Sequence, residues 1–457
     1  MSAVCRDPCQ SARVIAASSA GPGRNPTVSG VETELRMAGE RLLLSNVGRH
    51  RGWHAGTSLS DIASALVILC DLPLAVAQGV VDAYSLALSL RGVGPPPHFR
   101  RMRQLHQLQA PAAPSLTLPS VFPAGATLEL ANDTMHLRNV VLSAERCEVA
   151  VTYDRPPSWH MAGMPRAALR RSPMPHRMPG GPHQLTIADD QGTTSPAGFN
   201  GGGGDAGWEG RWVTQDPLST STRWLDIDGH RVPLPDPAPP AEVTIEPLAT
   251  GPLAHRYLWQ RLALQDHGGT DDDQLLDVLL RLGILDLEDE SDAATIETLH
   301  LVTEARSGGT KLRGAPGSVP PEWQSILGTK HRSGPTGTVA VGALTPVFDG
   351  IQCVVYDLRS ESDWFTFEAR VQGAGASPHP MMDDQVATAS LAWWANDDRG
   401  NSYLGHWNSH SSGAMEASGT LQFEPSLDRK ATVLYLTPTS LHSRAVITVP
   451  LPDWARR

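Results

Sequence analysis

The sequence predicts a multi-domain α+β chain, in which two duplicated all-β domains are separated by an acidic helical segment and preceded by an N-terminal helical region. Three observations lead to this prediction: a pentapeptide that occurs twice, alternating apolar residues upstream of both copies, and a run of acids between them. The chain has 457 residues, and single domains usually have roughly 100 to 200 residues. A hydrophobic content of 40% excludes a wholly disordered chain.

The pentapeptide Val-Pro-Leu-Pro-Asp marks an internal repeat, because it stands at Val232–Asp236 and again at Val449–Asp453. A second shared motif, Asp-Asp-x-Gly, precedes each copy, at Asp189–Gly192 and at Asp397–Gly400. Further upstream, Leu142 and Leu358 begin corresponding apolar runs. We interpret these matches as one duplicated unit that covers residues 125–237 and 343–454. Each copy then has the usual size of a domain.

Both copies contain the alternation of a half-buried β-strand. In the first copy Cys147, Val149, Val151 and Tyr153 occupy every second position, and Phe365, Phe367, Ala369 and Val371 do so in the second. A period of two places one face on a core and the other toward solvent. Several such short runs, separated by turn residues, are typical of a β-sandwich. In architecture the two units resemble immunoglobulin-like sandwiches, a fold that has many functions.

The rest of the chain divides by composition. We interpret residues 1–31 as a disordered N-terminus, residues 32–93 as an amphipathic helical region and residues 94–124 as a Pro/Arg-rich linker. Residues 156–182 are interpreted as a long loop inside the first unit, and residues 250–310 as an acidic helical hairpin. Within the hairpin, Leu253–Leu264, Asp271–Leu282 and Asp292–Arg306 are expected to be helical, with Ser291 as a cap.

The acids of the hairpin account for the net charge of −11. Twelve acids and one base lie between Asp266 and Glu304, so the remaining 36 acids and 36 bases cancel. A neutral body does not attract nucleic acid or anionic lipid over long range, and we therefore expect no nucleic-acid partner. The 37 basic residues include only three lysines, which indicates GC-rich coding of the kind found in actinobacteria.

The expected location is the cytoplasm of a bacterial cell. The first 25 residues lack the basic and apolar segments of a signal peptide, and the five cysteines are too scattered for a disulfide framework. The most apolar stretch, Ile62–Leu90, is interrupted by Asp71, Pro73 and Asp82. A membrane span needs about 20 nearly uncharged residues, so we expect none.

Several motifs have both a chemical and a structural interpretation. Gly202–Gly207 matches the G-x-G-x-x-G pattern of dinucleotide-binding loops, but it lies between two strand patterns and is interpreted as a hairpin tip. His406 and His410 have a spacing that on a helix can bind zinc, but the surrounding Gly and Ser residues favour a solvated loop. The Asp-Asp-x-Gly motifs have carboxylates suited to Ca²⁺, but such acids more often cap turns. The sequence thus predicts no cofactor, no metal and no catalytic residues.

The candidate binding residues surround the second Asp-Asp-x-Gly motif, where aromatic side chains are densest: Trp393, Trp394, Asp397, Asp398, Tyr403, His406 and Trp407. Aromatic groups beside acids are suited to a protein hot spot or to stacking on a sugar. We expect a non-enzymatic interaction or scaffold protein that binds another protein or a second copy of itself. The alternative is a hydrolase or a carbohydrate-active or carbohydrate-binding protein with its site on the second sandwich, using Asp397, Asp398 or His406.

Overall fold

The computed structural model describes most of the chain from residue 115 onward. The described residues are 115–130, 133–155, 157, 185–204, 207–248, 251–264, 283–306, 319–328, 333–373, 391–412 and 416–454, with Leu69, Leu276, Leu279 and Leu280. The predictions for 1–31, for 32–93 apart from Leu69, for most of 94–124 and for nearly all of the loop 156–182 lie outside these residues. So does the predicted helix Asp271–Leu282, except at the three leucines.

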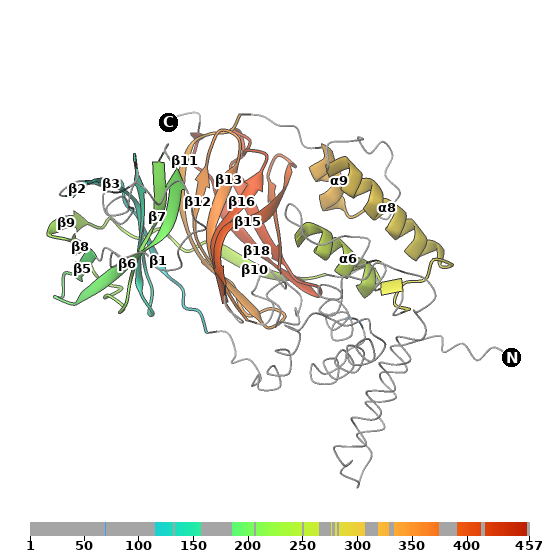
Figure 1. Ribbon diagram of the computed structural model, residues 1–457, viewed down its shortest axis with the longest axis horizontal. Coiled ribbons are helices and arrows are strands. Elements are labelled where there is room, and N and C mark those ends of the chain that lie inside the picture. Colours follow the sequence, from blue (N-terminus) through green and yellow to red (C-terminus); the bar gives the residue numbers. More distant parts are fainter. Residues whose placement is uncertain are drawn as a thin grey trace, which may run out of the picture.

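The described part is mainly β and forms two large curled sheets (Figure 1). The first sheet, here called the first unit, is antiparallel and contains β1 (Ser120–Pro123), β2 (Thr127–Leu130), β3 (Asp133–Leu142), β4 (Cys147–Tyr153), β5 (Leu185–Asp189), β6 (Thr194–Gly204), β7 (Gly207–Thr214), β8 (Trp224–Ile227) and β9 (His230–Pro233). Its strand order is β1-β3-β4-β7-β6-β5-β8-β9, and β2 pairs with β3.

The second sheet, here called the second unit, is also antiparallel. It contains β10 (Glu242–Pro247), β11 (Gly337–Leu344), β12 (Ile351–Ser360), β13 (Phe365–Gly373), β14 (Ala392–Asp397), β15 (Ser402–Ser412), β16 (Glu416–Glu424), β17 (Val433–Thr439) and β18 (Ser443–Pro450). Its order is β10-β18-β17-β14-β15-β16-β13-β12-β11. The two ends of this order, β10 and β11, contact each other, so the sheet curls round its own interior.

Eight strands have the same spatial order in both units. If β1 is matched with β11 and β3 to β9 are matched with β12 to β18, the two orders coincide. A β-bulge recurs at the same place, because the pairing skips Arg138 in β3 and Tyr356 in β12. Leu142 pairs with Cys147 next to the β3–β4 turn, and Ser360 pairs with Phe365 next to the β12–β13 turn, so Leu142 corresponds to Ser360. The alignment of the two repeats by sequence matched Leu142 with Leu358 instead. That match followed hydrophobicity, which carries no information about hairpin register.

Both units begin earlier than the sequence indicates. β1 starts at Ser120, inside the range interpreted as a linker, and β11 starts at Gly337, before residue 343. Each stands at the end of its strand order, where β1 pairs with β3 and β11 pairs with β12. Each also contains Pro or Gly, which weaken the sequence pattern of a strand. The second unit also gains β10 from the segment that follows the first unit.

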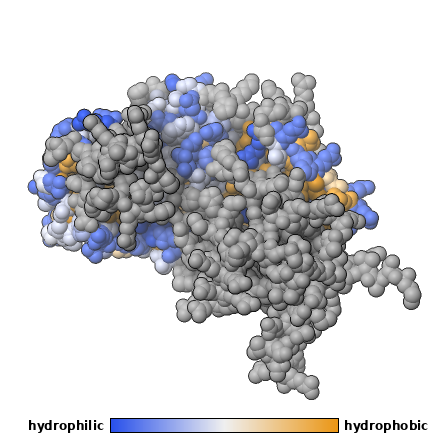
Figure 2. All heavy atoms as spheres, viewed as in Figure 1, coloured by the Kyte–Doolittle hydropathy of each residue, from blue (hydrophilic) through white to orange (hydrophobic). Residues whose placement is uncertain are grey.

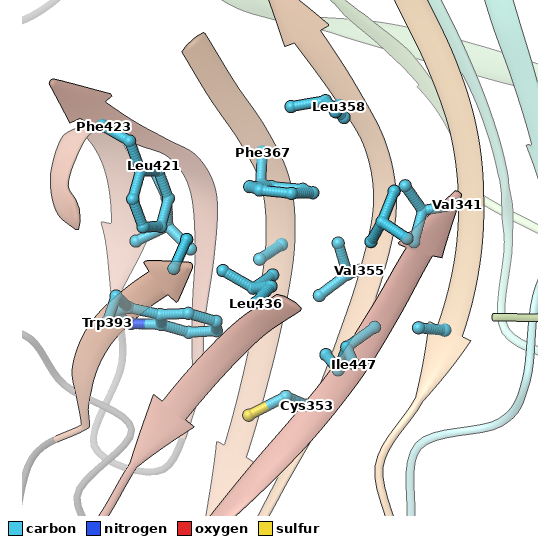
Figure 3. Close-up of a cluster of buried hydrophobic side chains, with 14 of the residues drawn as sticks. Val341, Cys353, Val355, Leu358, Phe367, Trp393, Leu421, Phe423, Leu436 and Ile447 are labelled. Atoms are coloured by element: carbon cyan, nitrogen blue, oxygen red, sulfur yellow. The ribbon is translucent and has the colours of Figure 1, made fainter. Parts of the chain in front are cut away.

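Each unit encloses its own hydrophobic core. In the second unit the alternating residues Phe365, Phe367, Ala369 and Val371 all lie within it, as predicted for one face of a strand. Figure 3 shows Phe367 among other side chains of this core. In the first unit Cys147, Val149, Val151 and Tyr153 lie in the corresponding core. The period of two therefore identified the inner face of both sheets.

Three helices are described over their whole length: α6 (Leu253–Leu264), α8 (Glu290–Arg306) and α9 (Pro321–Gly328). The described residues Leu69, Leu276, Leu279 and Leu280 are also helical. The bounds of α6 agree with the prediction. α8 begins at Glu290, and its first amides, those of Ser291 and Asp292, donate to Asp289 Oδ1 at 2.9 and 3.0 Å. Asp289, rather than the predicted Ser291, therefore caps this helix. None of the described helices is long and apolar enough to cross a membrane.

The helices lie between the two units in sequence but not in space. Figure 1 shows the two sheets side by side, with all three helices on the far side of the second sheet. α6 contacts β14 and α9 contacts β15. The expectation of a helical hairpin set between two sandwiches is therefore wrong in space. Strands β1 and β11 contact each other directly, which leaves no room for a helical layer between the sheets.

An apolar cluster and a buried ionic network join the two units. The cluster includes Val121 and Val141 from the first unit and Val354 and Tyr356 from the second. Beside it, Asn139 Nδ2 donates a hydrogen bond to Asp357 Oδ2. These two residues directly follow the matched bulges, so the units meet through equivalent strands.

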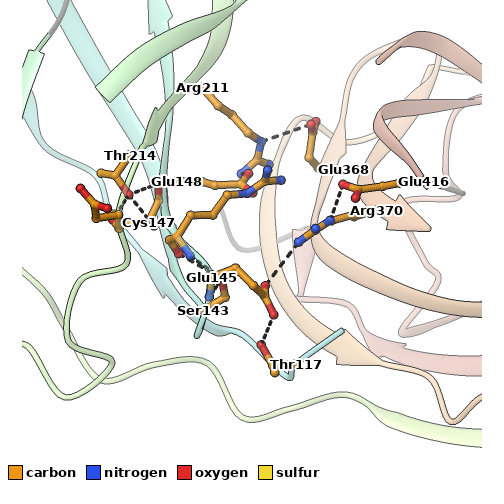
Figure 4. A network of polar contacts seen from close by, with 12 residues as sticks. Thr117, Ser143, Glu145, Cys147, Glu148, Arg211, Thr214, Glu368, Arg370 and Glu416 are labelled. Carbon is orange, nitrogen blue, oxygen red and sulfur yellow. Dashed lines mark hydrogen bonds and ion pairs between the residues drawn. The ribbon is translucent and has the colours of Figure 1, made fainter. Parts of the chain in front are cut away.

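Arg211 lies at the centre of the ionic network (Figure 4). Its guanidinium is 3.2 Å from Glu368 and 3.6 Å from both Asp357 and Glu148. It also lies over the ring of Tyr356, 5.3 Å from the centroid. Although burial opposes the charged form, these carboxylates raise the pKa of Arg211 above its ordinary value. One arginine of the first unit is thus held by two carboxylates of the second.

Candidate functional site

The aromatic candidates separate onto different sides of the second sheet. Trp393 is 2% exposed and Tyr403 is fully buried, and both belong to the core of the second unit. Trp407 packs edge-on against Trp393, with 6.0 Å between ring centroids. Trp394, the next residue on the same strand, points to the opposite face and contacts the helical layer through Trp323. Three of these four rings therefore serve packing, and Trp394 alone among them faces the helices.

Asp397 and Asp398 fasten the turn after β14. Asp397 is 5% exposed and accepts hydrogen bonds from the amides of Arg399 and Asn401, each at 2.9 Å, and from Tyr403 Oη at 2.8 Å. Asp398 accepts from the amide and the hydroxyl of Thr432. Because these carboxylates already hold backbone donors, their arrangement is that of turn caps. The preferred interpretation of this motif as a turn cap is confirmed.

The equivalent turn of the first unit is built in the same way. Asp189 accepts from the amides of Gln191, Thr193 and Ser219 at 2.8 to 3.0 Å. Asp190 accepts from Thr222 and Arg223. Although burial alone raises the pKa of a carboxyl, these amide donors hold the pKa of Asp189 below its ordinary value.

We expect Asp189→Asn to lower the free energy of unfolding at pH 7 by about 1.5 to 3 kcal/mol, because charge-assisted bonds to the carboxylate are lost. The stabilisation by Asp189 is present above its unfolded pKa and is lost as the pH falls through the lower folded pKa. The difference in the free energy of unfolding between wild type and variant should therefore become smaller from pH 7 to pH 3, as measured by urea denaturation. A gap that widens on acidification would contradict this assignment.

His406 lies in a strand, so the prediction of a solvated loop is wrong. It belongs to β15, where it pairs with Gln422 of β16 and is half-buried. The neighbouring Gly and Ser residues belong to this strand because its pairing with β16 supplies their backbone hydrogen bonds. The Gly202–Gly207 tract does form the end of the β6–β7 hairpin, where Gly204 pairs with Gly207, as predicted. Within the described residues, no group of three or more His, Cys, Asp and Glu side chains is placed to share a metal ion.

A cavity of about 630 Å³ lies between the helices and the outer face of the second sheet. α6, α8 and α9 contribute one part of its wall, and β14, β17 and β18 contribute the other. The cavity is of the size that small-molecule sites usually have. Of the seven residues selected from the sequence, Trp394 is the one that lines it.

Three tryptophans form a continuous aromatic wall in this cavity. Trp323 of α9 packs edge-on against Trp394, with centroids 5.1 Å apart, and is tilted against Trp259 of α6 at 5.9 Å. Trp323 is fully buried, and the other two are 7% and 8% exposed. Rings that are this buried provide an apolar boundary rather than an open stacking platform.

The histidine of the cavity is held at both ring nitrogens. His255 Nε2 is 2.6 Å from Asp292 Oδ1, and Nδ1 is 3.3 Å from the hydroxyl of Thr295. Both partners belong to α8, so this contact also fastens α6 to α8. A general base needs one nitrogen within reach of its substrate, and His255 has both nitrogens engaged with protein groups.

Two side chains of α6 bind the end of β17 and the turn that follows it. Arg256 Nη1 donates to the carbonyls of Leu441 and Leu248 at 2.8 and 3.1 Å. Gln260 Nε2 donates to the carbonyl of Thr439 at 3.2 Å. Polar residues one turn apart on α6 therefore fix the helix against the sheet while remaining part of the cavity wall.

Three polar atoms of the cavity residues are buried and have no hydrogen-bond partner within the part of the chain that the structure describes: Arg256 Nε, Trp323 Nε1 and Ser440 Oγ. Two of them are donors and the hydroxyl can donate. Buried donors without a partner are rare because each costs stability. These atoms have almost no accessible surface, so they are closed off from the interior of the cavity as well as from solvent.

The sequence contained partial signals for this site. It predicted α6 with its observed bounds and singled out Trp394, but Arg256, Trp323 and Ser440 carry no local motif. Pro321 at the first position of α9, followed by Glu322 and Trp323, is a start signal for a helix that the sequence interpretation missed. Only the packing of α6 and α9 on the sheet brings these residues together.

Comparison with known proteins gives no name for this arrangement. No family model matches the chain, and no curated protein matches it. A solved structure to which part of the chain is similar is described as the conserved domain protein from Bacillus anthracis. The two are 9% identical with a TM-score of 0.18, over 70% of this chain and 77% of that one. At that score the likeness supports no argument, so the functional case depends on the residues of the cavity.

Proposed function

We propose that this chain is a non-enzymatic interaction protein, in which two duplicated β units form a rigid support and the helix-covered face of the second unit recognises the partner. The cavity between α6, α9 and the second sheet is the single observation on which this depends. Its wall combines tryptophan rings with polar side chains, among them Arg256, Gln260 and Arg444. Such a combination of apolar lining and a few convergent polar groups is typical of a binding site.

The positions of the possible catalytic groups favour a binding function over hydrolysis. Asp397 and Asp398 are occupied by backbone donors, and His406 is on β15; none of the three lines the cavity. His255, which does line it, has both nitrogens engaged. The alternative of a hydrolase that uses these residues therefore has no supporting geometry. A sugar-binding role is also less favoured, because stacking on a sugar needs an exposed ring face.

The ionic network between the units supports the role of a rigid support. Arg211 is bound to carboxylates of both sheets, and equivalent strands meet directly. We further propose that each curled sheet is used as an immunoglobulin-like sandwich is used, as a stable body whose outer face carries the contact residues. The common strand order favours an origin of the units by duplication.

We infer that the partner is another protein or a second copy of this chain, in a bacterial cytoplasm. On the face in Figure 2, hydrophobic residues gather at the end of the molecule that carries the helices. In that layer Leu287 is 60% exposed and Leu301 is 36% exposed. Exposed apolar residues near a cavity suit a protein contact. Nucleic acid is not an expected partner, because the net charge is negative.

A bulky substitution at the entrance of the cavity tests the proposal. Ser291 is exposed and lines the cavity, so Ser291→Trp should fill the entrance while leaving the core unchanged. Glu297 is exposed on the same helix and is not a lining residue, so Glu297→Trp is the matched control. The full-length proteins would be purified from the native host, and bound compounds or peptides released by denaturation and identified by mass spectrometry.

We expect wild type and Glu297→Trp to carry the same bound species and Ser291→Trp to lose most of it. If all three proteins carry the species equally, the cavity is not the recognition site. If none of them carries any enriched species, the cavity holds no stable ligand, and the proposed function is wrong in this form.

A further inference from the structure

The outer face of α8 carries a row of glutamates. Glu290, Glu297 and Glu304 are all exposed and stand seven residues apart. At 3.6 residues per turn, this spacing returns each side chain to the same side of the helix, about 10.5 Å further along its axis. None of the three forms an ion pair within the part of the chain that the structure describes. This face therefore presents three negative charges that no described base neutralises.

Apolar side chains accompany these charges. Leu301 is four residues after Glu297 and three before Glu304, so it lies on the same face of α8. It is 36% exposed, and Leu287, just before the helix, is 60% exposed. Figure 2 shows hydrophobic residues beside hydrophilic ones at this end of the molecule. Exposed leucines between carboxylates form a contact surface for a segment that is both basic and apolar.

The opposite side of α8 fastens the helix to the protein. Leu299 and Val302 are buried on that side, and α8 contacts α6. The bond between His255 Nε2 and Asp292 Oδ1, at 2.6 Å, joins the same two helices. Because α8 is held by its buried side, its glutamate face is not required for the fold. Substitutions on that face can therefore report binding without unfolding the helix.

A segment of the opposite charge is inserted in the first unit. Residues 158–184, which connect β4 to β5, lie outside the described residues, and their sequence contains four arginines and no acid. Four methionines and Leu169 accompany the arginines. Bases together with adaptable apolar side chains complement exposed carboxylates and leucines. The arginines are Arg166, Arg170, Arg171 and Arg177.

A second copy can bring this segment to α8 more directly than the same molecule can. β4 and β5, where the segment begins and ends, belong to the first sheet. Figure 1 shows that sheet on one side of the second sheet and α8 on the other. Within one molecule the segment would have to pass round the second unit and return, and such extension has an entropic cost. The first unit of another copy meets the exposed face of α8 without that cost.

We propose that the glutamate face of α8, defined by Glu290, Glu297, Leu301 and Glu304, binds residues 158–184 of a second copy of this chain. This inference goes beyond the proposed function, because it uses the outer face of α8 and not the cavity. The contact joins two different surfaces, so each copy can both donate a segment and accept one. Salt weakens such a contact, because the charges that form it are exposed.

Two complementary variants test the contact. Sedimentation velocity of the full-length proteins, from micromolar to near-millimolar concentration, measures self-association. We expect the wild type to self-associate and each variant alone to do so at least about tenfold more weakly, through the loss of three exposed ion pairs. The face variant combines Glu290→Gln, Glu297→Gln and Glu304→Gln. The segment variant combines Arg166→Gln, Arg170→Gln and Arg171→Gln.

An equal mixture of the two variants should form a one-to-one complex, because it combines an intact face with an intact basic segment. This complex also shows that neither variant has lost its fold. Wild-type association should weaken at least about tenfold from about 50 to about 300 mM NaCl. The matched control removes three exposed acids that lie outside α8 and have no ion pair among the described residues, and it should associate like the wild type. It combines Asp236→Asn, Glu242→Gln and Asp363→Asn.

A wild type that stays monomeric at all these concentrations overturns the proposal and leaves the face to a different protein. A mixture that does not associate, or a control as weak as the face variant, overturns it as well. Association that is lost in the face variant but kept in the segment variant would reject residues 158–184 as the occupant, in favour of another basic segment such as residues 94–113. The cavity test is separate, because none of the substituted residues lines the cavity and Ser291→Trp leaves the glutamates in place.

Discussion

Arg211→Met is expected to lower the free energy of unfolding by about 3 to 5 kcal/mol, the usual result of removing one partner from a buried ionic network. Glu148 and Asp357, each 4% exposed, would lose the cation that neutralises them, and so would Glu368. Because these carboxylates come from both sheets, the contact between the units should be weakened first. Urea denaturation at pH 7 measures the loss, and limited proteolysis between the units reports their separation.

The free energy of unfolding that is lost in Arg211→Met should be smaller at acid pH. Burial raises the pKa of Glu368 even though Arg211 attracts its charge, so removal of Arg211 raises that pKa further. A carboxyl with a raised folded pKa stabilises the protein below its unfolded pKa, and this stability is lost as the pH rises through the folded pKa. The variant should therefore recover part of its stability between pH 7 and pH 4.5.

Arg399→Met is the matched control, because Arg399 is exposed and has no ion pair among the described residues. Its effect should stay within about 0.5 kcal/mol, as for ordinary surface substitutions. If Arg211→Met costs no more than this control, the network does not hold the units together. A loss that is unchanged between pH 7 and pH 4.5 would contradict the role of Glu368.

Phe423→Ala is expected to destabilise the protein by about 3 to 5 kcal/mol, through lost burial and the cavity left behind. Phe423 is fully buried, is stacked on Phe365 at 5.0 Å and is edge-on to Phe367 at 5.7 Å. It also lies opposite Gly405 on the neighbouring strand, where a Cβ would come within 2.4 Å of the ring. The ring thus covers a glycine across the strand pair, a known way of stabilising glycine in a sheet.

The contact between Phe423 and Gly405 can also be tested from the glycine side. Gly405→Ala alone should also destabilise, because the new methyl group collides with the ring, and Phe423→Leu should relieve part of that cost in the double variant. Val347→Ala, at a side chain that is 51% exposed, is the control for loss of methyl groups. Thermal and urea unfolding measure the free energy of unfolding of the wild type, of both single variants, of the double variant and of the control. Simple additivity of Gly405→Ala and Phe423→Leu would show that the two side chains do not share this space.

The sequence predicted features that depend on neighbouring residues. The alternation from Cys147 to Tyr153 identified the inner face of β4, and the Asp-Asp-x-Gly motif identified two turns whose carboxylates bind backbone amides. The bounds of α6 also followed from local pattern. In each case the residues that decide the structure lie within one strand, turn or helix, so their order along the chain is sufficient.

The errors have a common cause. His406 was expected in a loop because Gly and Ser surround it, but pairing of β15 with β16 outweighs that local preference. The helices were expected between the two β units because they lie between them in sequence, but the sheets contact each other through β1 and β11. Both errors concern partners that are distant along the chain.

By itself, the sequence determined the mainly β character of the described units, the inner faces of their strands and the turns that end them, since these depend on side-chain period and local hydrogen bonding. The tertiary structure alone decided which face of the second unit the helices cover and which residues line the cavity. Arg256, Trp323 and Ser440 are separated by 67 and 117 positions in the chain, and only the packing of helices on a sheet places them around one space.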